Sequence, residues 1–190
     1  MAGSIRVAGH TIAEHDIAND KVDIKNATLG DSVAGFGLIR NVELWRLTAN
    51  VTSAGDITTS NIERDDTYSA GSVLAGSGMT ISSGVFSFPT TGVWYIEARG
   101  AVASNEISLY NGLQIKTTTD NSSYNTAAIS YDSAYSASQA RAALICHKIF
   151  NVTNVSTHKV KFNFDTATNQ FLQGSTSVNY TTFMFMRVGD

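Results

Sequence analysis

Histidines provide the first candidates for chemistry in this sequence, either as metal ligands or as groups that titrate near neutral pH. Two of the four lie in an N-terminal polar cluster whose spacing matches no known zinc motif, so a solvated segment is the alternative to a metal site. This cluster comprises His10, Glu14, His15 and Asp16. His158 stands between polar neighbours and is expected to be exposed.

His147 alternates with Ile145 and Ile149 on a segment that is apolar on both faces. Near the symmetry axis of an oligomer, copies of this imidazole would repel one another when protonated, so acid would loosen the assembly. The alternative is a neutral histidine bonded to a backbone group. Both interpretations place His147 where copies of the chain meet.

The acidic residues form no catalytic pattern. Asp65–Asp66 and Asp120–Asn121 could offer oxygen ligands to calcium, but such a site needs about six ligands or more, and loop aspartates usually form turns. No nucleophile elbow, zinc-protease motif, phosphate loop or dinucleotide fingerprint occurs. The other carboxylates are scattered, so nothing indicates a glycosidase pair. The sequence therefore predicts no enzyme, no metal and no cofactor.

The composition favours a β-rich protein of the kind found in virions and outside cells. Of its 190 residues, 43% are hydrophobic and only 15% are charged, against about 25% charged residues in an average globular domain. The net charge of −3 and the scattered basic residues predict no nucleic-acid partner. Cys146 is the single cysteine, which excludes an intrachain disulfide and predicts a buried apolar side chain.

The sequence also predicts no membrane partner. No apolar run approaches the roughly 20 residues that span a bilayer, and no basic segment followed by an apolar one forms a signal peptide. We therefore expect a protein that is made in the cytoplasm of its host and is released by lysis.

Apolar residues recur at every second position through most of the chain, which predicts an all-β protein. The expected strands are residues 41–51, 57–62, 72–74, 84–88, 93–103, 106–117, 127–131, 140–152, 157–164 and 179–188. Asn111-Gly112 signals a tight hairpin or a bulge within one of them. Many short strands separated by turn residues are typical of an antiparallel sandwich or barrel.

Some of these strands are apolar on both faces. Residues 94–102, 143–150 and 180–187 belong to this class, whereas residues 107–115 and 159–164 alternate apolar and polar side chains. A two-sided strand buries one row in its own core, and the second row needs another surface. The contrast predicts an inner sheet that faces partner copies and an outer sheet that faces water.

The candidate contact residues between copies lie on the two-sided strands. Glu97 and Arg99 would pair across copies, because an unpaired buried charge costs several kcal/mol; exposure at the rim of the interface is the alternative. The full candidate set is Tyr95, Glu97, Arg99, Ile145, His147, Ile149, Phe183 and Phe185.

Residues 40–188 resemble a known family. The segment G-x-F-x-F-P-x-x-G-V-W-Y over residues 84–95 is similar to a strand–turn–strand motif of the complement globular-head and tumour necrosis factor superfamily. The segment S-L-Y-N-G over residues 108–112 resembles another stretch of that family, and residues 182–186 resemble its terminal strand. Similar endings occur in bacteriophage structural proteins. The resemblance implies a jelly-roll sandwich that assembles as a homotrimer. No collagen-like Gly-x-y repeat is present, and no calcium ligand can be assigned by motif.

The first 38 residues form a separate region ahead of the jelly-roll domain of residues 39–190. Residues 5–9 and 21–29 are expected to be two short strands around the polar stretch His10 to Asp20. So few apolar side chains cannot form a core alone, so the region is expected to be an arm that adds strands to a neighbouring protein; a frayed terminus is the alternative. The candidate anchoring residues are Ile5, Val7, Val22, Ile24 and Leu29.

These observations favour a bacteriophage virion protein, a trimeric knob that decorates or cements the capsid and binds the major capsid protein through its arm. The alternative is a tail fibre or tail-tip adhesin that binds a glycan on the host surface. Tyrosines in or beside loops could stack on sugars, although they also serve ordinary loop packing. These are Tyr68, Tyr124, Tyr131 and Tyr135.

Overall fold

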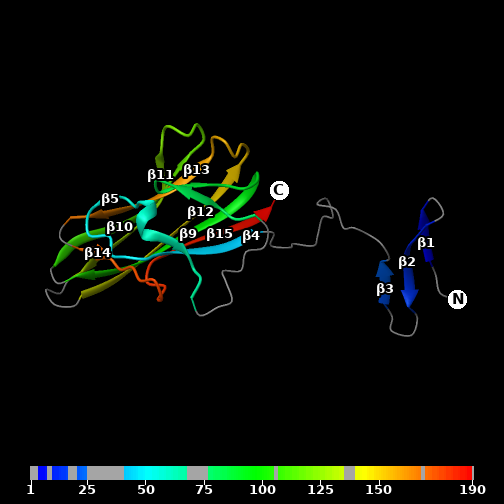
Figure 1. Cartoon of the computed structure of the whole chain (residues 1–190), viewed down its shortest axis with the longest axis horizontal. Coiled ribbons are helices and arrows are strands. Elements are labelled where there is room, and N and C mark those ends of the chain that lie inside the picture. Colours follow the sequence, from blue (N-terminus) through cyan, green and yellow to red (C-terminus); the bar gives the residue numbers. More distant parts are fainter. Residues whose placement is uncertain are drawn as a thin grey trace. The chain divides into compact units, whose positions relative to one another are not determined.

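The structure is a computed structural model that describes residues 4–7, 10–16, 21–24, 41–67, 77–104, 107–134, 140–167 and 170–189. The chain divides into two compact units, Met1–Gly37 and Leu38–Asp190 (Figure 1). Within the described ranges, no helix has the length and apolar character that crossing a membrane requires.

The N-terminal unit is a three-stranded antiparallel sheet in the order β1-β2-β3. Its strands are β1 (Ser4–Val7), β2 (His10–Asp16) and β3 (Lys21–Ile24). The two expected strands are present as β1 and β3, but His10–Asp16, expected to be a polar stretch between them, is a third and central strand. Its backbone pairs on both sides, and this pairing does not require an apolar sequence. Ile5 and Val7 lie in β1, and Val22 and Ile24 lie in β3. Leu29 and all side chains of this unit lie outside the described structure.

The second unit is a sandwich of two antiparallel sheets, as the sequence predicts. What we call the inner sheet has the order β12-β9-β15-β4-β6, with β14 paired to β9. Its strands are β12 (Ala140–Val152), β9 (Gly92–Ser104), β15 (Thr182–Gly189), β4 (Asn41–Leu47), β6 (Ile62–Arg64) and β14 (Phe171–Leu172). The strands with two apolar faces, β9, β12 and β15, are therefore neighbours.

What we call the outer sheet has the order β11-β10-β13-β8-β7, with β5 paired to β13. Its strands are β11 (Asn125–Ala134), β10 (Ser108–Thr118), β13 (Lys159–Thr166), β8 (Val85–Ser87), β7 (Thr80–Ser82) and β5 (Gly55–Asp56). The one-sided strands β10 and β13 pair directly. The predicted strand 57–62 is wrong: residues Thr59–Asn61 form a 3-10 helix, η1, between β5 and β6.

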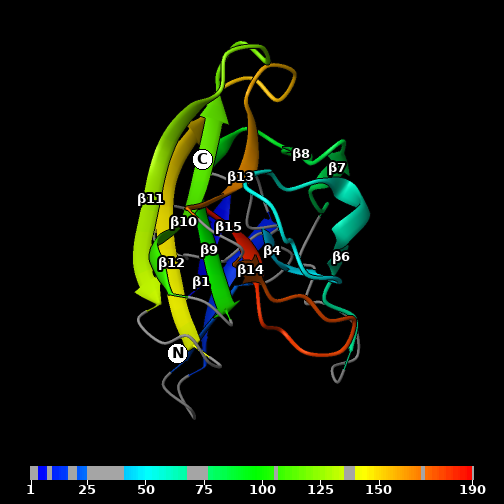
Figure 2. The same ribbon diagram turned by 90° about the vertical axis from the view of Figure 1, so that its left-hand side faces the viewer.

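The two sheets approach each other along one edge, where the long strands β11 and β12 lie side by side (Figure 2). The backbone amide of Ala143 donates to Asp132 Oδ2 at 3.4 Å, and the amide of Ile145 donates to Ser130 Oγ at 3.4 Å. Side chains of β11 thus satisfy donors on the free edge of β12, which would otherwise be open to pairing with another chain.

Aromatic rings from both sheets fill the space between them. Phe162 of β13 stacks on Phe183 of β15 with ring centroids 4.1 Å apart, and Phe86 of β8 packs against Phe185 at 4.9 Å. Phe183 and Phe185 are completely buried. Their predicted place at a contact between copies is therefore wrong. In a strand with two apolar faces, the bulkier aromatic row fills the core and the methionines face outward.

Two glycines explain the G-x-F-x-F-P-x-x-G segment. Gly84 has φ +77°, and a Cβ there would lie 2.3 Å from Ile57 O. Gly92 has φ +132°, and a Cβ there would lie 2.5 Å from Gly189 O. Any larger residue would both strain the backbone and collide with the backbone of another segment, so this motif requires glycine at each end.

Asn111-Gly112 forms a bulge and not a hairpin turn. β10 runs through it without a break, while its register against β11 shifts between Ser108 and Asn111. The shift interrupts the alternation of faces, as a bulge does. Leu113 is therefore fully buried, whereas Leu109, predicted to lie on the same face, is 81% exposed.

Candidate functional site

The outward face of the inner sheet is built from three rows of side chains that cross β4, β15, β9 and β12. Residues paired directly across neighbouring strands point to the same face, so the register defines each row. The rows are Val42–Met186–Tyr95–Ile149, Leu44–Met184–Glu97–His147 and Arg46–Thr182–Arg99–Ile145. Six of the eight predicted contact residues thus lie together on this face, and only Phe183 and Phe185 do not.

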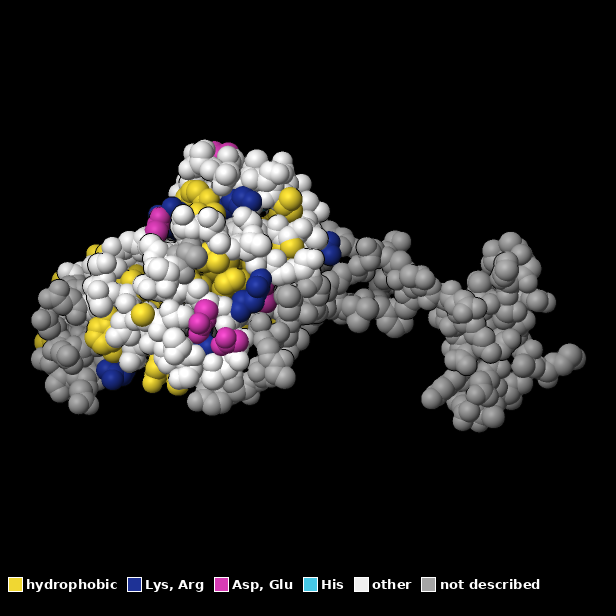
Figure 3. Space-filling view, viewed as in Figure 1, with side chains coloured by type: hydrophobic (Ala, Val, Ile, Leu, Met, Phe, Trp, Pro, Cys, Tyr) yellow, Lys and Arg dark blue, Asp and Glu magenta, His cyan; other side chains and the backbone are white. Residues whose placement is uncertain are grey.

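Apolar side chains on this face remain in contact with solvent. Ile145 and Ile149 are each 53% exposed, and Met184 and Met186 are half-buried. Single exposed apolar residues need no explanation, but a contiguous group marks an interaction surface. On the side of the jelly-roll unit shown in Figure 3, Lys, Arg, Asp and Glu side chains form small groups separated by uncharged surface.

A compact polar group lies in the middle of the apolar rows. Glu97 accepts hydrogen bonds from the Tyr95 hydroxyl at 2.8 Å and from Arg99 Nε at 2.6 Å. His147 is the cross-strand partner of Glu97, and its ring stacks on Tyr95 at 6.0 Å. Partial burial of Glu97 acts to raise its pKa, but these hydrogen bonds and the charges of Arg99 and His147 outweigh it and lower the pKa.

This group compensates its charges within one copy. Glu97 and Arg99 form an ion pair inside the subunit, whereas the sequence suggested a pair between copies. A carboxylate that already has two donors can be covered by another protein surface without leaving an unpaired charge.

Sequence reasoning missed a buried ion network at the edge of the inner sheet. Arg46 is 1% exposed and bonds Glu63, Asp65 and Asp66. On the opposite face of β4, Glu43 is also 1% exposed. Glu43 Oε2 accepts hydrogen bonds from Trp45 Nε1 at 2.9 Å and from Arg64 Nε at 3.1 Å. Glu43 Oε1 accepts a hydrogen bond from the backbone amide of Met79.

The network could have been predicted from Glu43 and Arg46, two charged residues within one apolar strand, because a buried charge requires a partner. The network also argues against a calcium site at Asp65–Asp66, because Arg46 already forms an ion pair with one oxygen of each carboxylate. Asp120 likewise serves its own turn, where its carboxylate accepts from the amides of Ser122 and Ser123, both at 2.8 Å. These bonds hold the pKa of Asp120 well below its ordinary range.

Two other predicted side chains can be compared directly with the structure. His158 is buried, so the expectation of exposure is wrong: its ring stacks on Phe150 at 5.6 Å, and both nitrogens contact threonine hydroxyls. Cys146 is a buried apolar residue, as predicted, and burial raises the pKa of its thiol to about 11. In the described ranges, no three His, Cys, Asp or Glu side chains converge as metal ligands. The side chains of the His10–Asp16 cluster lie outside the described structure.

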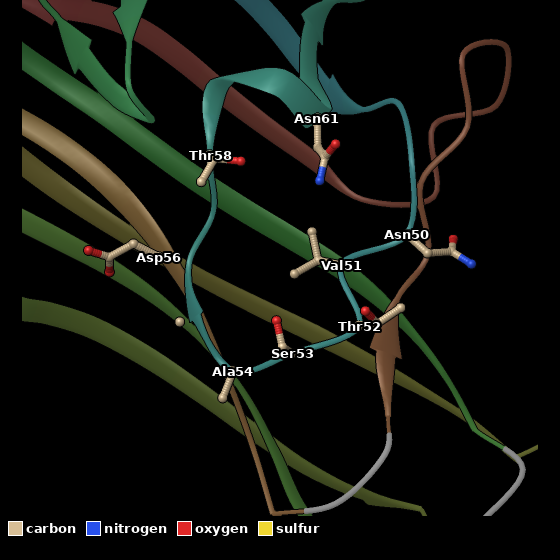
Figure 4. Close-up of a pocket in the computed structure, with 9 residues that line it drawn as sticks. Asn50, Val51, Thr52, Ser53, Ala54, Asp56, Thr58 and Asn61 are labelled. Atoms are coloured by element: carbon tan, nitrogen blue, oxygen red, sulfur yellow. The ribbon is translucent and has the colours of Figure 1, made fainter.

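A polar hollow of about 190 Å³ lies inside the loop that joins β4 to η1. Figure 4 shows Val51, Ser53 and Asn61 directed toward this space, while Asp56 points away from it. Hydroxyl and amide groups line the hollow beside Asp56, and such groups can hold water or weak hydrogen-bonding ligands.

No protein-family model matches this sequence, and no curated protein matches it significantly. Solved structures do share its fold. Murine APRIL at pH 5.0 superposes with a TM-score of 0.55 and 10% identity over 77% of this chain and 98% of that chain. Eiger TNF from S. frugiperda superposes with a TM-score of 0.58 and 10% identity over 80% and 94% of the two chains. At these identities the likeness establishes a tumour necrosis factor-like jelly roll and nothing further.

Proposed function

We propose that this chain is a structural protein of a bacteriophage virion, a homotrimeric jelly-roll knob that its N-terminal unit holds to the capsid as a decoration or cement protein. The observation that carries the proposal is the apolar outward face of the inner sheet. A face with exposed isoleucines and half-buried methionines in adjoining rows is suited to burial against other copies.

The layout of this face suits a ring of three copies. A closed ring of odd number needs two different surfaces that meet head to tail. On one side of the face, Ile145 and Ile149 stand on the edge strand β12; on the other, Val42 and Leu44 stand on β4. The β12 side of one copy can pack on the β4–β15 side of the next, and the third copy closes the ring.

The N-terminal unit supplies the proposed anchor. It is a compact unit separate from the jelly roll, and its first and last strands each present an edge that further strands can join. A trimer would carry three such units, and three simultaneous attachments raise the overall affinity for a shell without any new contact. The major capsid protein is the partner expected for a cement protein.

Sedimentation of the full chain tests self-association. We expect a trimer at low micromolar concentration and a shift to monomer for Ile149→Asp, because a carboxylate would be buried without a partner. Ile107→Asp is the matched control: Ile107 is 56% exposed, close to the 53% of Ile149, but it precedes β10 in the outer sheet. A monomeric wild-type chain would refute the assembly, as would equal dissociation by both variants.

Attachment to particles tests the anchor separately. We expect the full chain to rebind capsids from the encoding phage that have been stripped of it, in many copies spread over the shell, and a variant without residues 1–37 to remain trimeric and unbound. A variant that still covered shells would place the anchor in the jelly roll. A few copies confined to the tail would favour an adhesin and exclude a cement role.

A further inference from the structure

We infer that the outer sheet carries a binding site for an uncharged sugar, formed by Tyr110, Tyr131 and Asp165. These three residues line a shallow hollow of about 300 Å³ on the solvent side of β10, β11 and β13. The inference goes beyond the proposed assembly and does not depend on it, because the hollow lies on the other sheet from the face that would join copies.

The two tyrosine rings are exposed and held at a right angle. Tyr131 is 56% exposed and Tyr110 is 39% exposed, with ring centroids 5.7 Å apart and an angle of 89° between the planes. One ring can therefore serve as the floor of a site and the other as its wall. Solvent-facing strand positions usually carry polar side chains, so two neighbouring exposed rings form an unusual surface.

Gly112 creates the space in which Tyr131 lies. It pairs with Tyr131 on one side and with Asp165 on the other, so the three residues form one row across the sheet. A Cβ at Gly112 would lie 2.7 Å from Tyr131 Cε1 and 3.3 Å from Asp165 Cβ. The absent side chain leaves room for the ring to extend across the strand toward the carboxylate, which places the ring and the carboxylate next to each other.

The carboxylate gives the hollow its hydrogen-bonding character. Asp165 Oδ2 accepts from the Tyr131 hydroxyl at a long 3.4 Å, and no Lys or Arg of the described ranges forms an ion pair with it. An ionised carboxylate accepts up to about four hydrogen bonds, so it has capacity for further donors. Partial desolvation and the Asp165 charge raise the pKa of the Tyr131 phenol. A phenol is protonated at neutral pH in any case, so the hydroxyl is available as a hydrogen-bond donor.

A pyranose ring fits this combination of groups. Its C–H face packs on an aromatic ring, while its hydroxyls surround it as donors and acceptors. The negative carboxylate favours neutral sugars and disfavours uronic or sialic acids, because a second carboxylate would be repelled. Ile129 lies two positions before Tyr131 and is 37% exposed, so a second sugar unit could continue along β11.

Saturation-transfer NMR on the full chain tests the inference. The probes are methyl α-glucoside, methyl β-galactoside, methyl α-mannoside and methyl β-N-acetylglucosaminide, with methyl glucuronide as the anionic probe and decaproline as a peptide probe. We expect transfer to the C–H protons of at least one neutral glycoside, with a dissociation constant of about 1 to 10 mM, and little transfer to the glucuronide. Transfer to decaproline alone would assign the hollow to a peptide, and no transfer to any neutral glycoside would overturn the site.

Variants locate the bound sugar. Tyr131→Ala and Asp165→Ala should each weaken binding at least about five-fold, because each removes one half of the contact. Tyr131→Phe keeps the ring and should bind within about two-fold of wild type. Tyr180→Ala is the matched control, an exposed tyrosine that precedes β15 in the inner sheet. Circular dichroism shows whether each variant folds. If Tyr131→Ala does not, Tyr110→Ala decides: unchanged affinity in folded Tyr110→Ala and Asp165→Ala would refute the site.

Discussion

The two sheets of the jelly roll bury similar interiors and differ on their outward faces. Each sheet contributes aromatic residues to the same core, such as Phe162 from the outer sheet and Phe183 from the inner sheet. On its outward side, the outer sheet carries Lys116 and Lys161 around Asp56, whereas the inner sheet carries rows of isoleucine and methionine. The two sheets thus share one interior, while the side chains on their outward faces differ.

The sheets also place their ion pairs differently. Glu43 and Arg46 of the inner sheet are both 1% exposed, and each has several partners. The Asp56 side chain of the outer sheet is 41% exposed, and its lysine partners lie at the surface. Removing one partner of a buried pair leaves an uncompensated charge, whereas an exposed charge is solvated by water. Four predictions test the comparison between the two sheets.

Phe183→Ala is expected to have the largest effect on stability, a loss of about 3 to 5 kcal/mol in the free energy of unfolding. The substitution removes a fully buried ring that stacks on Phe162. Phe162→Ala should cost a similar amount, because both rings belong to one interface between the sheets. Urea denaturation at a fixed protein concentration measures both losses.

Val188→Ala serves as the control on the same strand. Val188 is 50% exposed, so its truncation should change the free energy of unfolding by less than about 0.5 kcal/mol. The core described here would be contradicted if Phe183→Ala lowered the free energy of unfolding by less than about 1 kcal/mol and instead dissociated the copies. Phe183 would then lie at the contact between copies.

The strand pattern could be predicted from the sequence because a long alternation of apolar residues has few alternative explanations. Ala140–Val152 has the predicted bounds, and the division between two-sided and one-sided strands matches the two sheets. The face on which each row lies could not be predicted for β15. A strand with two apolar faces gives the same pattern whichever row is buried, so Phe183 was assigned to the wrong side.

Strand pairing and side-chain contacts that do not follow an apolar pattern could not be predicted from the sequence either. β2 is a polar strand held by two neighbours, and Arg46 is buried by carboxylates that follow it by as many as 20 residues. His158 is buried by a contact with Phe150 across a turn. In each case a residue from another segment determines whether the side chain or strand is buried. The sequence pattern of one segment alone does not identify that residue.

Glu43→Ala should destabilise the chain by about 3 kcal/mol, because it leaves three hydrogen-bond donors without their acceptor. Those donors are Trp45 Nε1, Arg64 Nε and the amide of Met79. The same denaturation measurement applies. Glu63→Ala is the matched control in the neighbouring network: Glu63 is 33% exposed, and Asp65 and Asp66 still pair with Arg46. A loss for Glu43→Ala no larger than that of Glu63→Ala would show that burial does not separate the two carboxylates.

Substitution of two glycines by alanine compares how well the core and the outer surface accommodate an added methyl group. A Cβ at Gly100 would lie 2.9 Å from Leu172 Cδ2 and 3.2 Å from Leu113 Cδ2, both in the core. A Cβ at Gly112 would lie closer, 2.7 Å from Tyr131 Cε1, but that ring can rotate into solvent. We therefore expect Gly100→Ala to cost about 2 kcal/mol and Gly112→Ala less than about 1 kcal/mol. Thermal or urea unfolding of the two variants checks the order, and the reverse order would mean that the outer sheet holds Tyr131 rigidly.

The smallest effect concerns the exposed charges around Asp56. Burial acts to raise the pKa of this carboxyl, but hydrogen bonds from Lys161 and Asn163 and the charges of Lys161 and Lys116 outweigh it and lower the pKa below the ordinary 3.8. A carboxyl with a lower pKa in the folded state stabilises the fold above its unfolded pKa, and this contribution is lost as the pH falls through the folded value. At an exposed site it amounts to less than about 1 kcal/mol.

Lys161→Met should therefore destabilise the chain at pH 6 by less than about 1 kcal/mol, and by less again at pH 3, where Asp56 begins to protonate. Urea unfolding at the two pH values measures the difference. Lys159→Met is the matched control, because Lys159 Nζ donates to Ser87 Oγ and Val155 O and to no carboxylate of the described residues, so its loss should not depend on pH. Equal losses at both pH values for Lys161→Met would show that the Asp56 cluster contributes packing alone. The outer sheet would then resemble a surface whose charges serve only solubility, and its contrast with the buried pairs of the inner sheet would be larger still.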